Sequence, residues 1–273
     1  MFASARIVFR RALKAALGSR DQVRDVLAVG ALAMSCACLA GPSAGAQDLK
    51  VYSPTVEEGE FGIEARGNVA VDRNRDKAGA QNQRYELEYT PTDFWHTALV
   101  GELKKEAEGD LKYTATAWEN IFQIFPQGKE WLDLGFYIEY ESAKQRGSAD
   151  ALEWKLLAEK NFGLMTLTLN PIFEKEVGSN AEKSTEFKYA ARLKLRLMPQ
   201  LEPAIEAFGD IGEIGNLDPS DEQRHQLGPA LLGKFHLGNA SALRYELGYM
   251  FGLTRGGSPD GAFKWLIEIE HHF

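Results

Sequence analysis

The chain ends on the stretch Phe263-Lys264-Trp265-Leu266-Ile267-Glu268-Ile269-Glu270-His271-His272-Phe273, in which apolar and polar side chains alternate. One face of the stretch carries Phe263, Trp265, Ile267, Ile269, His271 and Phe273, and the opposite face carries Lys264, Glu268, Glu270 and His272. Successive side chains of a β-strand point to opposite sides of the backbone. The stretch therefore predicts a final strand with one apolar face and one charged face.

The same alternation recurs along most of the chain, separated by breaks rich in Gly, Asn, Asp, Ser or Pro. It predicts about twelve strands, at residues 60–72, 84–89, 95–104, 113–125, 132–141, 152–159, 165–174, 186–197, 201–211, 223–236, 243–251 and 263–273. Residues 113–125 and 223–236 are the least regular of these. Most of the segments have the length of tilted membrane-spanning strands, which is about 9–11 residues.

The predicted connections between the strands alternate in length. Short turns are predicted at residues 90–93, 126–129, 160–163, 198–200 and 238–240, and long polar loops near 73–83, 105–111, 142–150, 176–184, 213–222 and 254–261. An even-stranded up-and-down barrel with both termini on one side produces this arrangement. The fold class predicted is all-β, a single transmembrane antiparallel barrel of about twelve strands.

A final strand that closes on an aromatic residue resembles the outer-membrane β-barrel proteins of Gram-negative bacteria. The hairpin with Glu119–Pro126 and Phe136–Glu141 resembles uncharacterised proteobacterial proteins of porin or transporter type. The resemblance implies that Phe273 and its strand form the signal read by the barrel-assembly machinery. It also implies outer-membrane lipid as the surroundings and a location in the cell outer membrane, reached through the periplasm.

The first 46 residues have the features of a cleaved secretory signal peptide. Six basic residues precede the apolar stretch Val26–Ala40, which is followed by the small residues Ala44-Gly45-Ala46. A membrane anchor is the less favoured alternative, because the apolar stretch is shorter than the ~20 residues that span a bilayer. The predicted barrel domain is therefore 47–273, and both cysteines, Cys36 and Cys38, fall outside it.

The net charge reduces the number of possible functions further. Residues 47–273 carry 25 basic and 37 acidic residues, because six of the 31 basic and two of the 39 acidic residues lie in the predicted signal; the balance is −12. Nucleic acid is an unlikely partner for such a surface. No stretch after residue 46 is apolar over ~18 residues, so a membrane-embedded form would have to be a closed barrel.

Alternation alone leaves open which face lines the interior, since a soluble lipocalin-like barrel or a sandwich would turn the apolar face inward. We expect the apolar face to point outward for three reasons. About twelve strands enclose more volume than one apolar row fills. The opposite row is dense in charge, and aromatic residues gather near the predicted strand ends, as interfacial girdles do.

Charged side chains of the predicted inner face are the candidate lumen residues. The candidates are Arg66, Arg84, Glu86, Glu88, Glu139, Glu141, Lys188, Arg192, Lys194, Arg196, Glu202, Glu206, Arg244, Glu246 and Glu268. They can form a selectivity field for a permeating solute, or they can pair across strands and fill the lumen with ion pairs. Both interpretations stay open at the level of sequence.

No pattern of catalytic or metal-ligating residues accompanies these charges. The chain carries no HExxH, CxxC, GxGxxG or P-loop motif, and His96 is interpreted as a plain lumen residue. We therefore expect no enzyme, no catalytic residue, no cofactor and no metal.

The favoured function is a porin-like channel for passive passage of small polar or charged solutes. A non-conducting structural or interaction barrel is the alternative, and a lipid-modifying enzyme is less favoured. The oligomeric state and the solute are left open.

Overall fold

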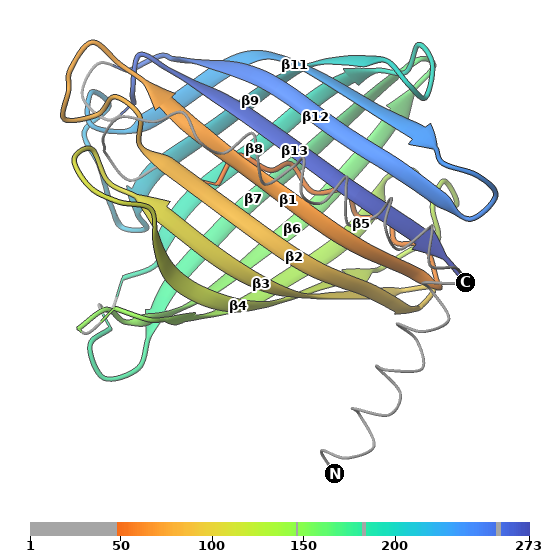
Figure 1. Cartoon of the computed structure of the whole chain (residues 1–273), viewed down its shortest axis with the longest axis horizontal. Coiled ribbons are helices and arrows are strands. Elements are labelled where there is room, and N and C mark those ends of the chain that lie inside the picture. Colours follow the sequence, from red (N-terminus) through yellow and green to blue (C-terminus); the bar gives the residue numbers. More distant parts are fainter. Residues whose placement is uncertain (1–47, 146, 182–183, 255–257) are drawn as a thin grey trace.

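The computed structural model describes residues 48–145, 147–181, 184–254 and 258–273, and within them the chain forms an all-β barrel (Figure 1). Twelve long strands build the barrel, and one two-residue strand extends a loop. The strands are β1 Glu60–Val71, β2 Gln81–Thr92, β3 Trp95–Lys105, β4 Lys112–Gln123, β5 Asp133–Ala143, β6 Asp150–Phe162, β7 Met165–Val177, β8 Glu186–Leu195, β9 Glu202–Glu213, β10 Asn216–Leu217, β11 Arg224–His236, β12 Ser241–Gly252 and β13 Gly261–His272.

The first and last strands close the sheet. β1 pairs with β13 in antiparallel register from Glu60 opposite His272 to Val71 opposite Gly261. Every other long strand pairs with the long strands before and after it in the chain. The short β10 pairs only with β9, so β9 and β11 are direct neighbours in the ring. The ring therefore has no open long edge, and its backbone groups are paired within the sheet, as a lipid environment requires. This confirms the predicted up-and-down barrel of about twelve strands.

Connection lengths follow the predicted alternation with two departures, of which one is the β8–β9 connection: it covers residues 196–201 and is longer than the predicted turn 198–200. The chain termini of the barrel lie at one end, which we call the turn end, and the long loops lie at the opposite end, the loop end (Figure 1). The connection from β4 to β5 covers residues 124–132 at the turn end and is longer than the predicted turn 126–129. β10 was not predicted either, because two residues are too few to show a period.

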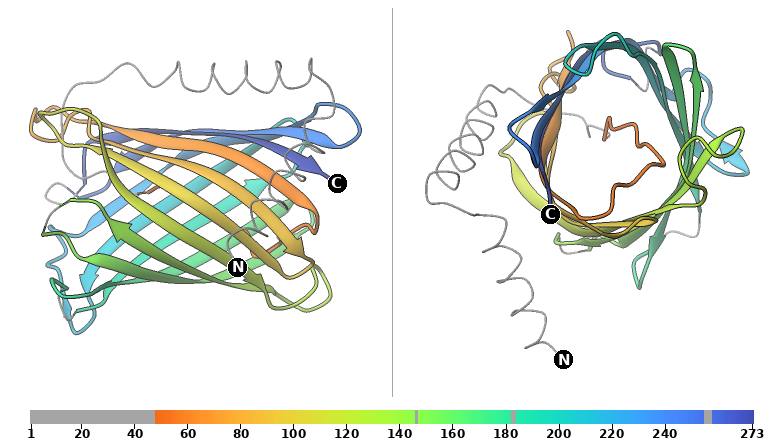
Figure 2. Two further views of the ribbon diagram at one scale, coloured as in Figure 1. Left: turned by 60° about the horizontal axis from the view of Figure 1, so that its bottom comes forward. Right: turned by 90° about the vertical axis from the view of Figure 1, so that its right-hand side faces the viewer.

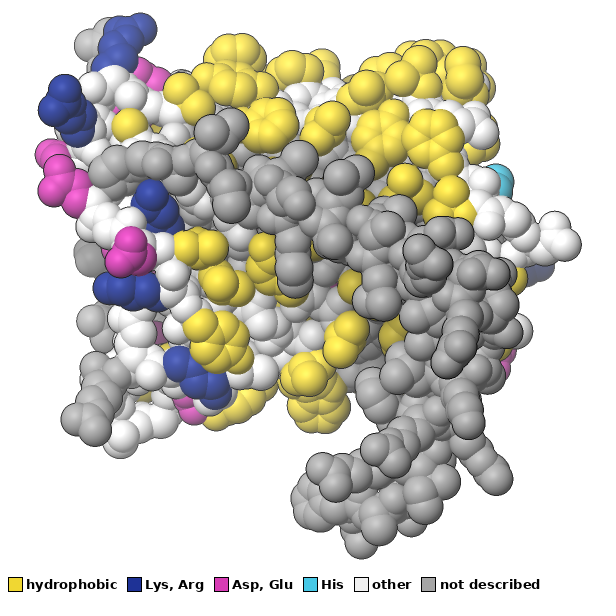
Figure 3. Space-filling view, viewed as in Figure 1, with side chains coloured by type: hydrophobic (Ala, Val, Ile, Leu, Met, Phe, Trp, Pro, Cys, Tyr) yellow, Lys and Arg dark blue, Asp and Glu magenta, His cyan; other side chains and the backbone are white. Residues whose placement is uncertain are grey.

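The apolar row faces outward, as predicted. Leu99, Trp118 and Ile205 expose 56%, 57% and 56% of their surface, whereas Glu64, Glu86 and Glu206 expose 2%, 2% and 0%. Hydrophobic side chains cover the outer wall, and Lys, Arg, Asp and Glu gather at the loop end (Figure 3). An apolar exterior around a charged interior is the inverse of a soluble barrel and is typical of barrels whose solvent is lipid.

The predicted signal peptide, residues 1–46, lies outside the described residues. The described chain instead begins at Asp48, inside the ring of strands, where residues 48–58 run as an extended trace before β1 (Figure 2). We call residues 48–58 the lumenal strap. Among the described residues, no helix is long and apolar enough to cross a membrane.

Candidate functional site in the lumen

The lumenal strap enters the barrel from the turn end and reaches its middle. At the turn end the Gly59 amide donates to the Thr90 carbonyl at 2.9 Å, and the Phe273 amide donates to the Gly59 carbonyl at 3.3 Å. From there the strap leads inward to Asp48, which contacts Arg66 in the middle of β1. A segment of chain thus lies across the path that a solute would take.

The strap is extended, so its odd and even side chains point to opposite walls. Leu49 and Val51 meet the wall formed by β7 to β13. Asp48, Lys50 and Tyr52 meet the wall that includes β1, β2, β4 and β5. The patch that Leu49 and Val51 cover, which we call the apolar wall, lies among inward-facing charged residues of the same strands, such as Arg192, Glu206 and Lys264. Asp48, Lys50 and Tyr52 face the charged wall opposite, so the strap matches both surfaces.

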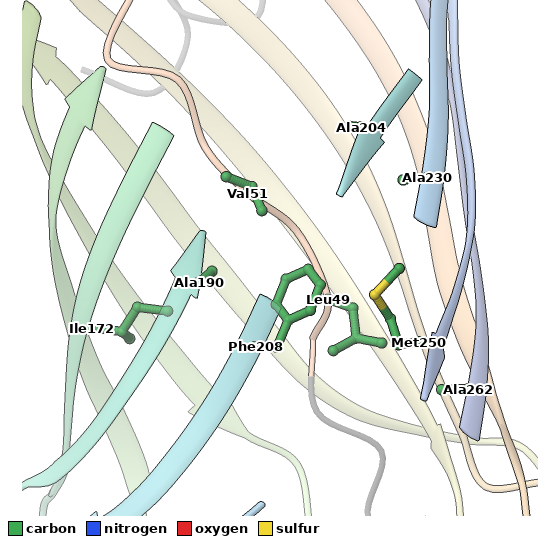
Figure 4. Packing of buried hydrophobic residues seen from close by; sticks show 9 residues of the cluster. All are labelled: Leu49, Val51, Ile172, Ala190, Ala204, Phe208, Ala230, Met250 and Ala262. Carbon is green, nitrogen blue, oxygen red and sulfur yellow. The ribbon is translucent and has the colours of Figure 1, made fainter. Parts of the chain in front are cut away.

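The apolar wall consists of small residues with a few larger ones. Leu49 and Val51 are both 5% exposed and cluster with Ile172, Ala190, Ala204, Phe208, Ala230, Met250 and Ala262. In the view of Figure 4, Leu49 lies between Phe208 and Met250. Alanine at four of these positions leaves the space that the two strap side chains fill. Burial of a side chain of this size contributes about 1.5–3 kcal/mol.

The charged wall holds Asp48 and Lys50 by ion pairs. The Asp48 carboxylate lies 3.1 Å from the Arg66 guanidinium and 3.7 Å from that of Arg84. The Lys50 ammonium lies 2.9 Å from Glu64 and 3.5 Å from Glu86. Arg66 also pairs with both of these glutamates, so the strap joins an existing network of buried charges.

Tyr52 is the most deeply held residue of the strap, at 3% exposure. Its hydroxyl donates to Glu119 at 3.0 Å and accepts from Arg66 at 3.0 Å. The Lys155 ammonium lies 4.1 Å from the centre of its ring, within cation–π range. The hydroxyl and the ring therefore have separate partners on the charged wall.

The side chain of Asn170, on β7, forms hydrogen bonds with the backbone of Tyr52. Its side-chain carbonyl accepts from the Tyr52 amide at 2.8 Å, and its side-chain NH2 donates to the Tyr52 carbonyl at 3.0 Å. Nearer the turn end, Gln123 accepts from the Val56 amide at 2.9 Å. Gly135 makes room for the strap, because a Cβ there would lie 2.9 Å from the Pro54 side chain.

Asp48 and Lys50, which belong to no strand, remain ionised over a wide pH range. Burial would raise the pKa of Asp48, but Arg66 and Arg84 outweigh that effect and hold it well below its ordinary value. Burial would lower the pKa of Lys50, but Glu64 and Glu86 hold it well above its ordinary value. The Asp48 contacts therefore contribute above the ordinary carboxyl pKa and are lost only in strong acid.

Two cavities adjoin the strap, one towards each end of the barrel. The cavity towards the loop end measures about 260 Å³ and is lined by Asp48, Lys50, Arg84, Glu139 and Lys188, among others. The cavity at the turn end measures about 390 Å³, and the strap residues Lys50 to Glu57 form part of its lining. The strap residue Lys50 lines both cavities, so the strap lies where the two meet and narrows the lumen there.

The turn-end cavity carries more acidic than basic side chains. Its acidic lining residues are the nine carboxylates Glu57, Glu60, Glu64, Glu88, Glu119, Glu159, Glu202, Glu246 and Glu268, and its basic ones are Lys50, Arg192, Lys194, Lys234 and Arg244. Glu64, Glu86 and Glu88 bring oxygen atoms within 4.8 Å of one another, a spacing that could hold a cation. Lys50 and Arg66 already pair with the first two of these glutamates.

The structure brings most of the predicted lumen residues together in ion pairs. Arg66 pairs with Glu86, Arg84 with Glu139, Arg192 with Glu206 and Glu246, Lys194 with Glu202, Lys188 with Glu174 and Glu186, and Arg244 with Glu268. Glu141 lines the loop-end cavity and Glu88 the turn-end cavity. Arg196 lies beyond β8 and donates to the Gly163 carbonyl in a turn.

Sequence reasoning missed the strap and the residues that hold it. Asp48, Lys50, Tyr52, Glu64, Glu119 and Asn170 were not among the candidates. One signal was present: Asp48-Leu49-Lys50-Val51-Tyr52 alternates like the strands although it lies ahead of the first of them. Such a segment needs partners for both faces, and the inside of the barrel supplies them.

No protein-family model matches the chain, and no curated protein matches its sequence. Solved porins match its structure. The NanC porin is 7% identical over 77% of this chain and 100% of that chain, with a TM-score of 0.52. The KdgM porin in complex with disordered oligogalacturonate is 8% identical over 78% and 99%, with a TM-score of 0.47. An anion-selective porin from Comamonas acidovorans is 9% identical over 78% and 98%, with a TM-score of 0.37.

With a TM-score of 0.52 at 7% identity, the likeness to the NanC porin is a likeness of fold. The chain has a porin-like barrel fold. The NanC porin is an independent example of this arrangement of strands. The fold alone does not identify a solute, so the chemistry of the lumen residues has to indicate one.

Proposed function

We propose that the chain is a porin-like channel of the Gram-negative outer membrane for passive passage of small polar or charged solutes. The single observation that carries the proposal is the closed barrel with an apolar exterior and a charged interior that retains two cavities. Charged groups that face a passage set which solutes pass, and passage itself requires no catalytic group.

The narrowed lumen favours a second candidate, a non-conducting barrel with an interaction or structural role. Ion pairs such as Arg66 with Glu86 and Arg192 with Glu246 cross the inner wall, and the strap fills the space between the walls. Under this alternative the strap is a permanent part of the interior. Under the channel proposal the strap narrows the passage and leaves it when the channel conducts fully.

Conductance in a planar bilayer distinguishes the two functions. The protein would be refolded in detergent, checked for a heat-sensitive electrophoretic mobility that reports a folded barrel, and added to a bilayer in KCl. We expect stepwise currents, which increase in a variant that lacks residues 48–57. Correctly folded barrels that stay silent in both forms would contradict the channel and support the non-conducting barrel.

A further inference from the structure

We propose that the inner walls around the strap form a binding site for short zwitterionic peptides, which the strap occupies as a built-in ligand. The inference deepens the channel proposal, on which it rests, by naming a class of solute. The strap residues Asp48 to Tyr52 lie in the lumen as a bound peptide would, with side chains, backbone and charges each met by a separate group of the wall.

Opposite charges of the strap are recognised at two separate places. Arg66 and Arg84 meet the carboxylate of Asp48, and Glu64 and Glu86 meet the ammonium of Lys50. Carboxylate and ammonium groups are the two charges of a zwitterionic peptide. When the strap leaves, both places lose a partner, and buried charges that lose a partner bind a replacement favourably.

Asn170 distinguishes a peptide from other solutes. Its amide pairs with both the donor and the acceptor of one residue, Tyr52, at 2.8 and 3.0 Å. With the strap in place Asn170 is 1% exposed, so the strap backbone takes the place of water at both of its polar ends. The backbone of one peptide residue presents a donor and an acceptor at the spacing of this side-chain amide, whereas a monatomic ion offers no such pair.

The alanine-lined wall adds selectivity for apolar side chains. Ala190, Ala204, Ala230 and Ala262 are inward-facing, although charged residues predominate elsewhere on the inner face. Without Leu49 and Val51 this wall would expose an apolar surface to water. Binding of other apolar side chains to it would then be favourable. A peptide that alternates charged and apolar residues therefore fits both walls at once.

The tether makes the strap a strong competitor. A short flexible connection holds a ligand at an effective concentration in the millimolar range, so a free peptide has to displace it. We therefore expect free peptide to bind weakly to the full chain. The same peptide should bind to a barrel from which the strap has been removed or loosened.

The test measures peptide binding by calorimetry in detergent. The probe is the peptide Asp-Leu-Lys-Val-Tyr-Ser, which copies residues 48–53, and its matched control is Lys-Leu-Asp-Val-Tyr-Ser, which exchanges the two charges. The barrel lacking residues 48–57 should bind the probe at least about tenfold more tightly than the control, a difference of about 1.4 kcal/mol. Asn170→Ala in that barrel should weaken binding of the probe.

A second variant, Leu49→Ser with Val51→Ser in the full chain, loosens the strap without removing it and should also gain binding of the probe over the unchanged protein. Equal binding of probe and control, or none to either folded variant, would overturn the proposal. Failure of both variants to form a folded barrel would also overturn it, because the strap would then be part of the wall.

These experiments can reject the peptide-binding site and the channel function independently of each other. Calorimetry requires no current, so a barrel that binds the probe but conducts nothing would retain the peptide site and reject the channel. A barrel that conducts KCl but does not distinguish probe from control would retain the channel and reject the peptide site. If both are right, the probe reduces the KCl current of the strap-deleted barrel more than the control does.

Discussion

At the scale of single residues, Asn170 and Tyr52 determine how firmly the lumen is closed. Two hydrogen bonds join the Asn170 side chain to one backbone unit, and the Tyr52 hydroxyl adds two more to Glu119 and Arg66. Each involves groups removed from water. Loss of a partner at such a place costs more than loss of a surface hydrogen bond, because the group left behind stays unpaired.

We predict that Asn170→Ala releases the strap. The loss of about 1–3 kcal/mol should increase the released population roughly 5- to 160-fold. A released strap hangs from Gly59 outside the turn end, where trypsin can cut after Lys50, and mass spectrometry of the new terminus at Val51 measures the rate. Thr168→Ala is the control, because Thr168 lies on the same face of β7 and donates to Glu159. An equal cleavage rate in both variants would contradict this role of Asn170.

At the scale of elements, β11 shows why one strand had a weak pattern. Gly228 and Pro229 interrupt its pairing with β12, where the register passes from Leu227 opposite Phe251 to Ala230 opposite Gly248. Proline has no amide hydrogen to donate, and a Cβ at Gly228 would lie 1.9 Å from the Tyr249 carbonyl oxygen. The strand approaches its neighbour closely because it carries no side chain at that point.

Gly228→Ala should therefore destabilise the barrel. The obstacle is backbone, which moves less readily than a side chain, and overpacking of this kind costs about 1–3 kcal/mol. Urea unfolding of the refolded protein, followed by tryptophan fluorescence, measures the change. Gly109→Ala is the matched control, since a Cβ there meets nothing within 4 Å. A Gly228→Ala barrel as stable as the control would show that β11 and β12 can separate without cost.

The final strand carries the proposed assembly signal. Phe273 is 59% exposed, its amide donates to the Gly59 carbonyl, and its ring packs edge-on against that of His271 with 5.2 Å between centres. We predict that Phe273→Ala lowers the amount of barrel in outer-membrane fractions severalfold while refolding of the purified protein in detergent is unchanged. Phe263→Ala, on the same outer face of β13, controls for loss of an aromatic residue. A similar loss from both variants would reject a specific signal.

At the scale of the whole molecule, the uneven charge of the turn-end cavity should make the channel prefer cations. Carboxylates outnumber cationic side chains there, and the loop-end cavity is closer to balance. Charged linings set the sign of ions that pass. We predict a reversal potential of cation-selective sign in a KCl gradient across the strap-deleted barrel. Glu159→Gln, at the lining of the turn-end cavity, should reduce it, whereas Glu108→Gln, in an exposed loop, should not. An anion-selective potential would contradict the prediction.

Much of the fold could be predicted because most strands show the two-residue alternation within their own sequence. Leu99, Trp118 and Ile205 all lie on the outer side because the two-residue period assigns each side chain to a face without reference to the rest of the chain. The candidate site was only partly predictable for the same reason. Arg192 and Glu206 are placed on the inner face by their own strands, and their pairing follows from the register of β8 with β9.

By itself, the sequence of this protein determined the number of long strands, which side chains of a strand share a face and the end at which the termini meet, because alternation and turn residues act over a few neighbouring positions. Only the tertiary structure placed residues 48–58 inside the barrel. Tyr52 meets Glu119 and Asn170 across separations of 67 and 118 residues, and no local period encodes such contacts. Closure of the ring brings two unlike walls to face each other, and that closure creates the site the strap fills.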